Sequence, residues 1–116
     1  GRFLESPLVE QACLGGHGLA QTVMMAVLSA AAQGLSDAEL DAELRAWVQS
    51  INARLEKHER IGAVILSRTP WSQDNGVLTH TLKIKRDAVD ERYSEELERA
   101  GDRMRTGEPL FVVTVE

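Results

Sequence analysis

A chain of 116 residues is long enough for one domain but too short for most enzymes that bind two substrates on a nucleotide fold of their own. It carries 13 basic and 18 acidic residues, a formal net charge of −5, which excludes an overall basic footprint for sequence-independent DNA binding. A local basic patch could still bind a phosphate group. Cys13 is the only cysteine, so no internal disulfide can form and a cytoplasmic location is expected.

No segment is long and apolar enough to suggest a membrane span. The longest weakly polar stretch, residues 19–32, is interrupted by three polar residues and is too short to cross a bilayer. The sequence begins at Gly1 without a methionine, and apolar residues such as Phe3 and Leu4 follow at once. We therefore expect the chain to be a piece of a longer polypeptide.

Two short apolar segments near the start predict a β-hairpin. Residues 9–14 have the composition of a strand, and residues 23–28 form an apolar run of a length that suits a buried strand. Between them, Gly15, Gly16 and Gly18 favour a tight turn, because glycine adopts positive φ at little steric cost.

A long amphipathic helix is predicted over residues 37–59. Ser36 is a suitable N-cap, and Glu39 three residues later completes a capping box. The apolar stripe that follows has helical spacing, so its side chains are expected in the core. The stripe consists of Leu40, Leu44, Trp47, Val48, Ile51 and Leu55.

A core strand is expected at 61–66, followed by a loop at 71–76 in which Asn75-Gly76 is a strong turn signal. In that loop Trp71 could cover the core or contact another molecule. Residues 77–85 alternate in part between apolar and polar types, which predicts an extended segment. One side of this segment would carry Thr79, Thr81, Lys83 and Lys85.

Asp87 is the expected cap of a second helix, and residues 110–115 form a third apolar run that suits an edge strand. The helix would bury the stripe Val89, Tyr93, Leu97 and Ala100. The order of elements predicts an α+β fold, in which a small sheet of about three strands plus a β-hairpin packs against amphipathic helices.

The lysine-bearing segment 79–86 has two interpretations. A lysine presented from a loop could reach a phosphate or a carboxylate, because it places a compact cation on a long stem. The segment could equally be a solvated basic edge strand, and the residues alone favour this second interpretation, since short basic stretches are common.

The glycine run is a weak signal for phosphate binding. It lacks the spacing and the Lys-Ser/Thr ending of a P-loop, so a plain turn is favoured. The histidines His17, His58 and His80 stand at no metal-ligand spacing with each other or with the cysteine, and no metal site is expected.

Taken together, three segments resemble one family. Residues 6–12 followed by 15–18, then 51–61, and then 71–86 resemble, in this order, the C-terminal domain of AMP-forming acyl-CoA synthetases. The last segment looks like the lysine motif of the long-chain fatty acid subgroup. The likeness covers residues 3–99, although His80 stands where the subgroup usually has proline, and 101–116 match nothing in the family.

This resemblance implies part of a two-step ligase. In such enzymes a carboxylate attacks the α-phosphate of ATP, with Mg²⁺ present, to give acyl-adenylate and pyrophosphate, and CoA then displaces AMP. The small domain rotates between the two steps. The resemblance assigns the adenylation lysine to Lys83 and the loop that contacts substrate or nucleotide to Gly76 and Thr79. It assigns contacts on the CoA side to Gly15, Gly16, His17 and Gly18.

The implied partners are a large N-terminal domain of the same polypeptide, acyl-adenylate and CoA, and no ligand is expected on this chain alone. The acid could be long-chain, medium-chain or aromatic, because the acyl pocket belongs to the large domain. An alternative is a stand-alone α+β binding module without a catalytic step. A small nucleic-acid binder is disfavoured by the net charge of −5.

Overall fold

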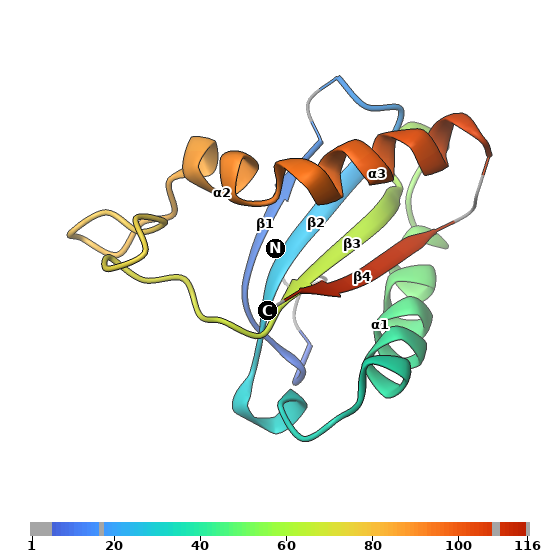
Figure 1. Cartoon of the computed structure of the whole chain (residues 1–116). Coiled ribbons are helices and arrows are strands. Elements are labelled where there is room, and N and C mark those ends of the chain that lie inside the picture. Colours follow the sequence, from blue (N-terminus) through green and yellow to red (C-terminus); the bar gives the residue numbers. More distant parts are fainter. Residues whose placement is uncertain (1–5, 17, 108–109, 116) are drawn as a thin grey trace.

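A four-stranded sheet in the order β1-β2-β3-β4 forms the centre of the molecule (Figure 1). The computed structural model describes residues 6–16, 18–107 and 110–115. β1 (Val9–Gly15) and β2 (Thr22–Leu28) are antiparallel, whereas β3 (Ile61–Ser67) runs parallel to β2 and β4 (Phe111–Val115) runs parallel to β3. The predicted hairpin and edge strand are therefore confirmed, and both belong to the same sheet.

The helices cover the two faces of this sheet. α1 (Asp37–Asn52) connects β2 to β3, and α2 (Arg86–Arg92) with α3 (Ser94–Arg105) connects β3 to β4. Each pair of parallel strands needs such a crossover. Figure 1 shows α1 on one side of the sheet and the α2–α3 pair on the other. The predicted α+β class is confirmed. None of the helices in the described ranges is long and apolar enough to cross a membrane.

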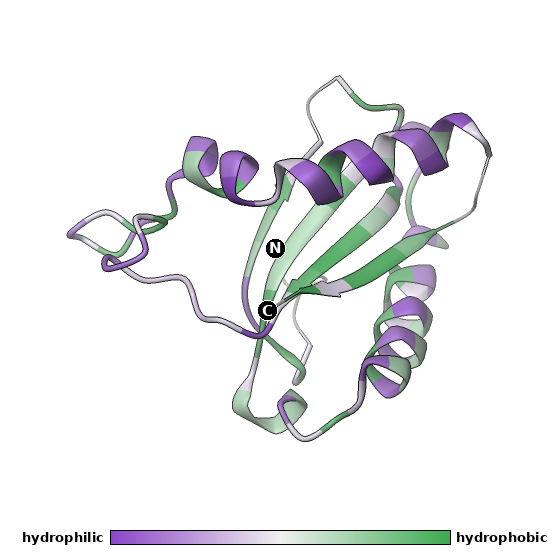
Figure 2. Cartoon of the chain, viewed as in Figure 1, coloured by the Kyte–Doolittle hydropathy of each residue, from purple (hydrophilic) through white to green (hydrophobic). Residues whose placement is uncertain are grey.

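The central strands bury both of their faces. In β2, Met24 and Ala26 lie in the cluster with α1, while Val23 and Met25 lie in the cluster with α2 and α3. Successive side chains of a strand point to opposite faces, so a strand covered on both sides reads as one continuous apolar run. Figure 2 shows strands that are largely hydrophobic and helices in which hydrophilic residues are frequent.

α1 begins as predicted but ends earlier. The Ser36 hydroxyl accepts a hydrogen bond from the Glu39 amide (3.1 Å), and the Glu39 carboxylate accepts one from the Ser36 amide (3.0 Å). The helix ends at Asn52, whose side chain binds the backbone of Ile61 through both its nitrogen (2.9 Å) and its oxygen (2.8 Å). The prediction of helix to residue 59 is therefore wrong. Two short 3-10 turns, η2 (Ala30–Ala32) and η3 (Lys57–Glu59), flank this helix in the chain.

The two tryptophans differ in burial. Trp47 packs against the α1-side cluster but stays partly exposed, so the expectation that it lies fully in the core is not met. Trp71 is only 3% exposed, and its indole nitrogen donates a hydrogen bond to the Tyr93 hydroxyl (2.8 Å). Trp71 therefore covers the core, which is one of the two predicted alternatives.

The second predicted helix is two helices. α2 contacts β1 and α3 contacts β3 and β4, and the change of direction occurs at Tyr93, whose φ of −111° and ψ of 24° are not helical. The expected cap at Asp87 is wrong: Lys85 holds the N-cap position, and no side chain caps this end. Along the predicted stripe, Val89 and Ala100 are buried with Tyr93.

Candidate functional site

The loop 71–85, which carries the predicted lysine, is fixed to the α2–α3 side of the sheet by its apolar residues. Trp71, Val77 and Leu78 are 3%, 1% and 8% exposed and lie in the same cluster as Val89 and Tyr93. Because three of its side chains belong to the core, the loop leaves the sheet from a rigid base.

The first half of the loop is a turn built around Asn75. The side-chain oxygen of Asn75 accepts hydrogen bonds from the amides of Ser72 (3.0 Å) and Val77 (3.3 Å), and its nitrogen donates to the Pro70 carbonyl (2.9 Å). Gly76 follows with a φ of +79°, a conformation in which a glycine is favoured. The predicted Asn-Gly turn is confirmed.

The second half of the loop is a small hairpin, so the predicted extended segment over 77–85 is wrong. Leu78 and Ile84 form an antiparallel bridge. Between them, the Leu82 amide donates to the Thr79 carbonyl (2.8 Å) and the Thr79 amide donates to the Lys83 carbonyl (2.8 Å). The Thr79 hydroxyl also accepts from the Lys83 amide (3.0 Å). These local bonds compete with a continuous strand and close the turn.

Leu82 takes an unusual conformation at the tip of this hairpin. Its φ is +64°, which makes it the one non-glycine residue with a positive φ in the ranges the structure describes. The left-handed region costs an ordinary L-residue about 1–2 kcal/mol. The side chain of Leu82 is also 67% exposed, although the alternation in the sequence placed it on the same side as the buried Leu78 and the partly buried Ile84.

Lys83 follows directly and is exposed. Both of its backbone polar groups bind Thr79, so the position of its Cα is well determined. Among the residues described, nothing forms a hydrogen bond or ion pair with the Lys83 ammonium group. The lysine is therefore an exposed side chain on a backbone that hydrogen bonds hold in place.

The structure groups the predicted loop residues in two places. Thr79 lies with Lys83, and its hydroxyl is engaged in shaping the hairpin. Gly76 instead lines a pocket of about 600 Å³ with Lys85 and the first turns of α2. Sequence reasoning missed Gln73, whose side-chain nitrogen donates to the Thr79 carbonyl (3.2 Å), since a polar residue in a loop gives no signal of this contact.

The glycine turn between β1 and β2 lies on the other side of α2 from the lysine hairpin (Figure 1). Gly16 and Gly18 have φ values of +88° and +82°, so the predicted turn is confirmed. At Gly15 an added Cβ would come within 2.5 Å of the Met25 methyl group. His17, the remaining residue predicted on the CoA side, lies outside the described residues.

Cys13 lies on β1 under the start of α2. Burial raises the pKa of its thiol, the nearby Arg86 lowers it and Asp90 raises it, and burial is the largest of these influences. The Arg86 side chain also donates to the carbonyl of Leu14 (3.1 Å), which ties α2 to the strand before the glycine turn. A thiol held neutral by burial is a poor nucleophile, so Cys13 acts as part of the core.

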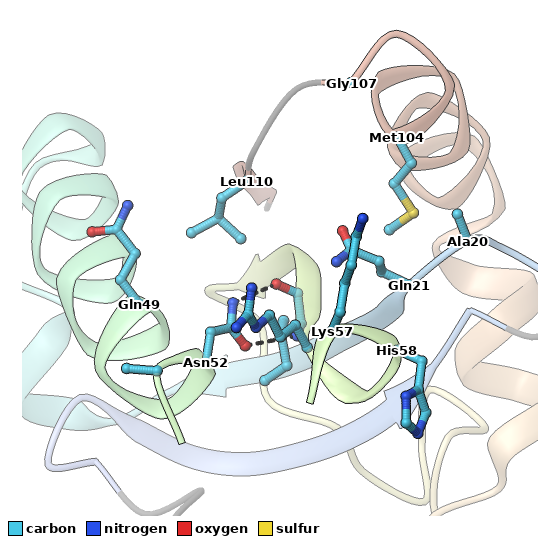
Figure 3. Close-up of a pocket in the computed structure, with 12 residues that line it drawn as sticks. Ala20, Gln21, Gln49, Asn52, Lys57, His58, Met104, Gly107 and Leu110 are labelled. Atoms are coloured by element: carbon cyan, nitrogen blue, oxygen red, sulfur yellow. Dashed lines mark hydrogen bonds between the residues drawn. The ribbon is translucent and has the colours of Figure 1, made fainter. Parts of the chain in front are cut away.

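A pocket of about 1000 Å³ lies away from the lysine hairpin, where the end of α1, η3, the start of β3 and the end of α3 meet (Figure 3). Its titratable side chains are the basic or imidazole groups of Lys57, His58 and Arg60. His58 also lines a smaller pocket of about 380 Å³ beside the glycine turn. The described residues contain no group of three or more His, Cys, Asp or Glu side chains placed to hold a metal.

Comparisons with known proteins identify the family. A sequence model described as the AMP-binding enzyme C-terminal domain matches residues 2–105. Carboxylic acid reductase of Mycobacterium marinum is 32% identical over 102 residues, which cover 84% of this chain and 9% of that protein. Probable acyl-activating enzyme 16, chloroplastic, of Arabidopsis thaliana is 37% identical over 57 residues, 49% of this chain and 7% of that protein.

A solved structure has the same fold. The A-PCP didomain of carboxylic acid reductase from Segniliparus rugosus, in complex with AMP, superposes with a TM-score of 0.67 at 27% identity, covering 84% of this chain and 14% of that chain. This chain thus spans only 7% to 9% of the length of these curated relatives. With nearly its whole length matched, the chain belongs to the family of AMP-binding enzyme C-terminal domains.

Proposed function

We propose that this chain is the mobile C-terminal domain of an AMP-forming acid–thiol ligase and that Lys83 is its adenylation lysine. The observation that carries the proposal is the exposed Lys83 side chain, unpaired among the described residues, on a hairpin with a fixed backbone. The family match supports it, since the relatives include acyl-activating enzymes. The large domain that would bind ATP and the acid lies outside this chain.

The proposed role follows from the charges of the first half-reaction. A carboxylate oxygen attacks the α-phosphorus of ATP, a new acyl–oxygen–phosphorus bond forms, and the bond to pyrophosphate breaks. The two reacting groups are both anionic, so bringing them together is opposed by their charge. A lysine placed between their oxygens offsets this repulsion and stabilises the charge that develops in the transition state.

The second half-reaction does not require a cation between two anionic reacting groups. A thiol attacks the acyl carbon and AMP leaves, so the domain can rotate and withdraw Lys83. The glycines of the β1–β2 turn are the proposed contacts on the CoA side, since their backbone allows close approach. In the described residues no three His, Cys, Asp or Glu side chains are grouped to hold a metal, and we assign Mg²⁺ to the large domain.

The proposal also specifies the acid that is activated and the thiol that accepts the acyl group. A fatty acid is the proposed substrate and CoA the proposed acceptor. Another relative is named a long-chain-fatty-acid–[acyl-carrier-protein] ligase, at 35% identity over 57 residues. An assay with the full-length parent should therefore offer CoA and a phosphopantetheinylated carrier protein in parallel, with long-chain, medium-chain and aromatic acids. The lone cysteine keeps the cytoplasm as the proposed location.

The test of the catalytic assignment is Lys83→Ala in the full-length parent. Loss of one positioned cation should slow acyl-adenylate formation by about 10²–10³-fold. Thioester formation from supplied acyl-adenylate should stay close to normal, because Lys83 acts in one orientation of the domain only. ATP–pyrophosphate exchange measures the first step, and thioester release measures the second.

Lys85→Ala is the matched control, because Lys85 is also exposed, lies two residues away and should affect exchange only mildly. Normal exchange in Lys83→Ala, or a larger loss in Lys85→Ala, would show that the lysine is wrongly assigned. The 116-residue chain alone should give background exchange with every acid. Robust exchange there would contradict the need for a second domain.

A further inference from the structure

Leu82 combines two features that occur together nowhere else in the described residues. It is a non-glycine residue with a φ of +64°, and it is an exposed large hydrophobic residue. We propose that Leu82 is a positioning residue for Lys83, and that its side chain seats the hairpin tip in an apolar recess of the large adenylation domain. This inference rests on the proposed function, because it concerns the orientation in which Lys83 enters the reacting centre.

The backbone of the hairpin explains why the residue before Lys83 must be left-handed. The bonds from the Leu82 amide to the Thr79 carbonyl and from the Thr79 amide to the Lys83 carbonyl define a loop of three residues. In such loops the last residue commonly takes the left-handed conformation, and glycine is the usual occupant. The conformation of Leu82 therefore sets the direction in which the chain delivers Lys83.

The positive φ at this position disfavours leucine. Glycine or asparagine would adopt the same φ with less strain. Strained residues persist where the surrounding structure determines them and where the strain serves a function. The leucine side chain must then contribute something that a smaller or polar side chain would not.

The part of the chain that the structure describes does not bury the Leu82 side chain. The neighbouring apolar residues of the loop, Val77 and Leu78, are buried, and Ile84 packs against the same cluster. Leu82 instead remains 67% exposed. The side chain thus points away from the core that holds the rest of the loop.

The large domain is the occupant that the observations favour. The relatives of this chain are much longer, since it spans 9% of one carboxylic acid reductase and 14% of the similar solved chain. Under the proposed function, the large domain is the polypeptide that covers Leu82. When Lys83 reaches the nucleotide, the adjoining residue must meet the same surface, and an exposed leucine gains most from a surface that is apolar.

Three substitutions in the full-length parent separate side chain from backbone. Leu82→Gly and Leu82→Asn accept the left-handed conformation but remove the apolar side chain, while Leu82→Met keeps an apolar side chain of similar size. We expect the first two to lower kcat for ATP–pyrophosphate exchange by about tenfold, as for loss of a small apolar contact, and Leu82→Met to stay within about twofold. All three should form thioester from supplied acyl-adenylate normally.

Thermal unfolding of the 116-residue chain supplies the structural control. Leu82→Gly and Leu82→Asn should leave Tm unchanged or raise it, because they relieve backbone strain in an exposed hairpin. A fall in exchange without a fall in Tm cannot come from unfolding. Normal exchange in both variants, or equal losses in both half-reactions, would overturn the inference.

Two further outcomes distinguish other occupants and a failure of the proposed function. If the variants changed KM for the acid in step with its chain length, Leu82 would contact the acyl chain and not the large domain. If Lys83→Ala kept normal exchange in the same parent, the proposed function would fail at the lysine. With Lys83→Ala inactive, the Leu82 variants report on the contact by itself.

Discussion

The two faces of the sheet are covered in different ways. On one face, a single regular helix buries Leu40, Leu44 and Val48 against the strands. On the other face, two short helices share the surface with the lysine loop, and a buried hydrogen bond joins Trp71 of the loop to Tyr93. The side chains that the first face buries are apolar, with the Asn52–Ile61 bonds at its edge, whereas the second face connects the core to the candidate catalytic residue. Changes on the two faces should therefore affect stability and adenylation differently.

The largest expected loss of stability is on the α1 face. Leu44 is 0% exposed, so Leu44→Ala should lower the free energy of unfolding by about 2–5 kcal/mol through lost burial and a residual cavity. Urea denaturation of the 116-residue chain measures this change. In the full-length parent, at a temperature where the variant is folded, exchange should remain near normal. A proportionate loss of exchange would show that the two faces are not independent.

On the opposite face, a substitution with a smaller effect on stability should nevertheless affect the loop 71–85. Tyr93→Phe leaves the buried indole nitrogen of Trp71 without an acceptor, which should cost about 1–3 kcal/mol. The same change loosens the base of the loop, so exchange should fall more than in Leu44→Ala.

The partner substitution and the double variant provide the control for Tyr93→Phe. Trp71→Phe removes the donor, and a double-mutant cycle gives the coupling energy of the pair. If the cycle showed no coupling, or if Tyr93→Phe spared exchange, the proposed connection between core and loop would be wrong.

Elements that depend on neighbouring residues could be predicted from the sequence. The Ser36–Glu39 capping box fixes the start of α1 within four residues, and the structure contains both of its hydrogen bonds. The continuous apolar runs at 23–28 and 61–66 are strands buried on both faces. The turn at Asn75-Gly76 likewise depends on residues that are close together in the sequence.

Features that depend on distant partners could not be predicted. α1 ends where Asn52 binds Ile61, nine residues later, and no glycine or proline marks that end in the sequence. The Trp71–Tyr93 bond joins residues 22 positions apart. The four strands pair in a single sheet, and nothing in the last apolar run indicates that it pairs with β3 in parallel.

The lysine hairpin shows a third case, in which a local pattern is misleading. Apolar residues at 78, 82 and 84 fit the period of a strand, and this period predicted an extended segment. The Thr79 hydroxyl offers the Lys83 amide a local acceptor, and the chain turns back. The resemblance of the whole segment to a family motif is what singles out Lys83 as the candidate, since periodicity alone favours a solvated strand.

The smallest expected change in stability tests the hairpin directly. Thr79→Val keeps the shape of the side chain but removes the acceptor of the Lys83 amide, and because the site is partly exposed the cost should be about 0.5–1 kcal/mol. In the full-length parent, exchange should nevertheless fall several-fold, because a displaced lysine loses its alignment with the reacting oxygens. Thr79→Ser retains the hydroxyl and should restore most of the rate. The two variants should then differ in opposite directions. Leu44→Ala should lose much stability and keep normal exchange, whereas Thr79→Val should lose little stability and show impaired exchange. If Thr79→Val lowered exchange only as far as its stability change would explain, the hairpin would carry Lys83 without determining its alignment with the reacting oxygens.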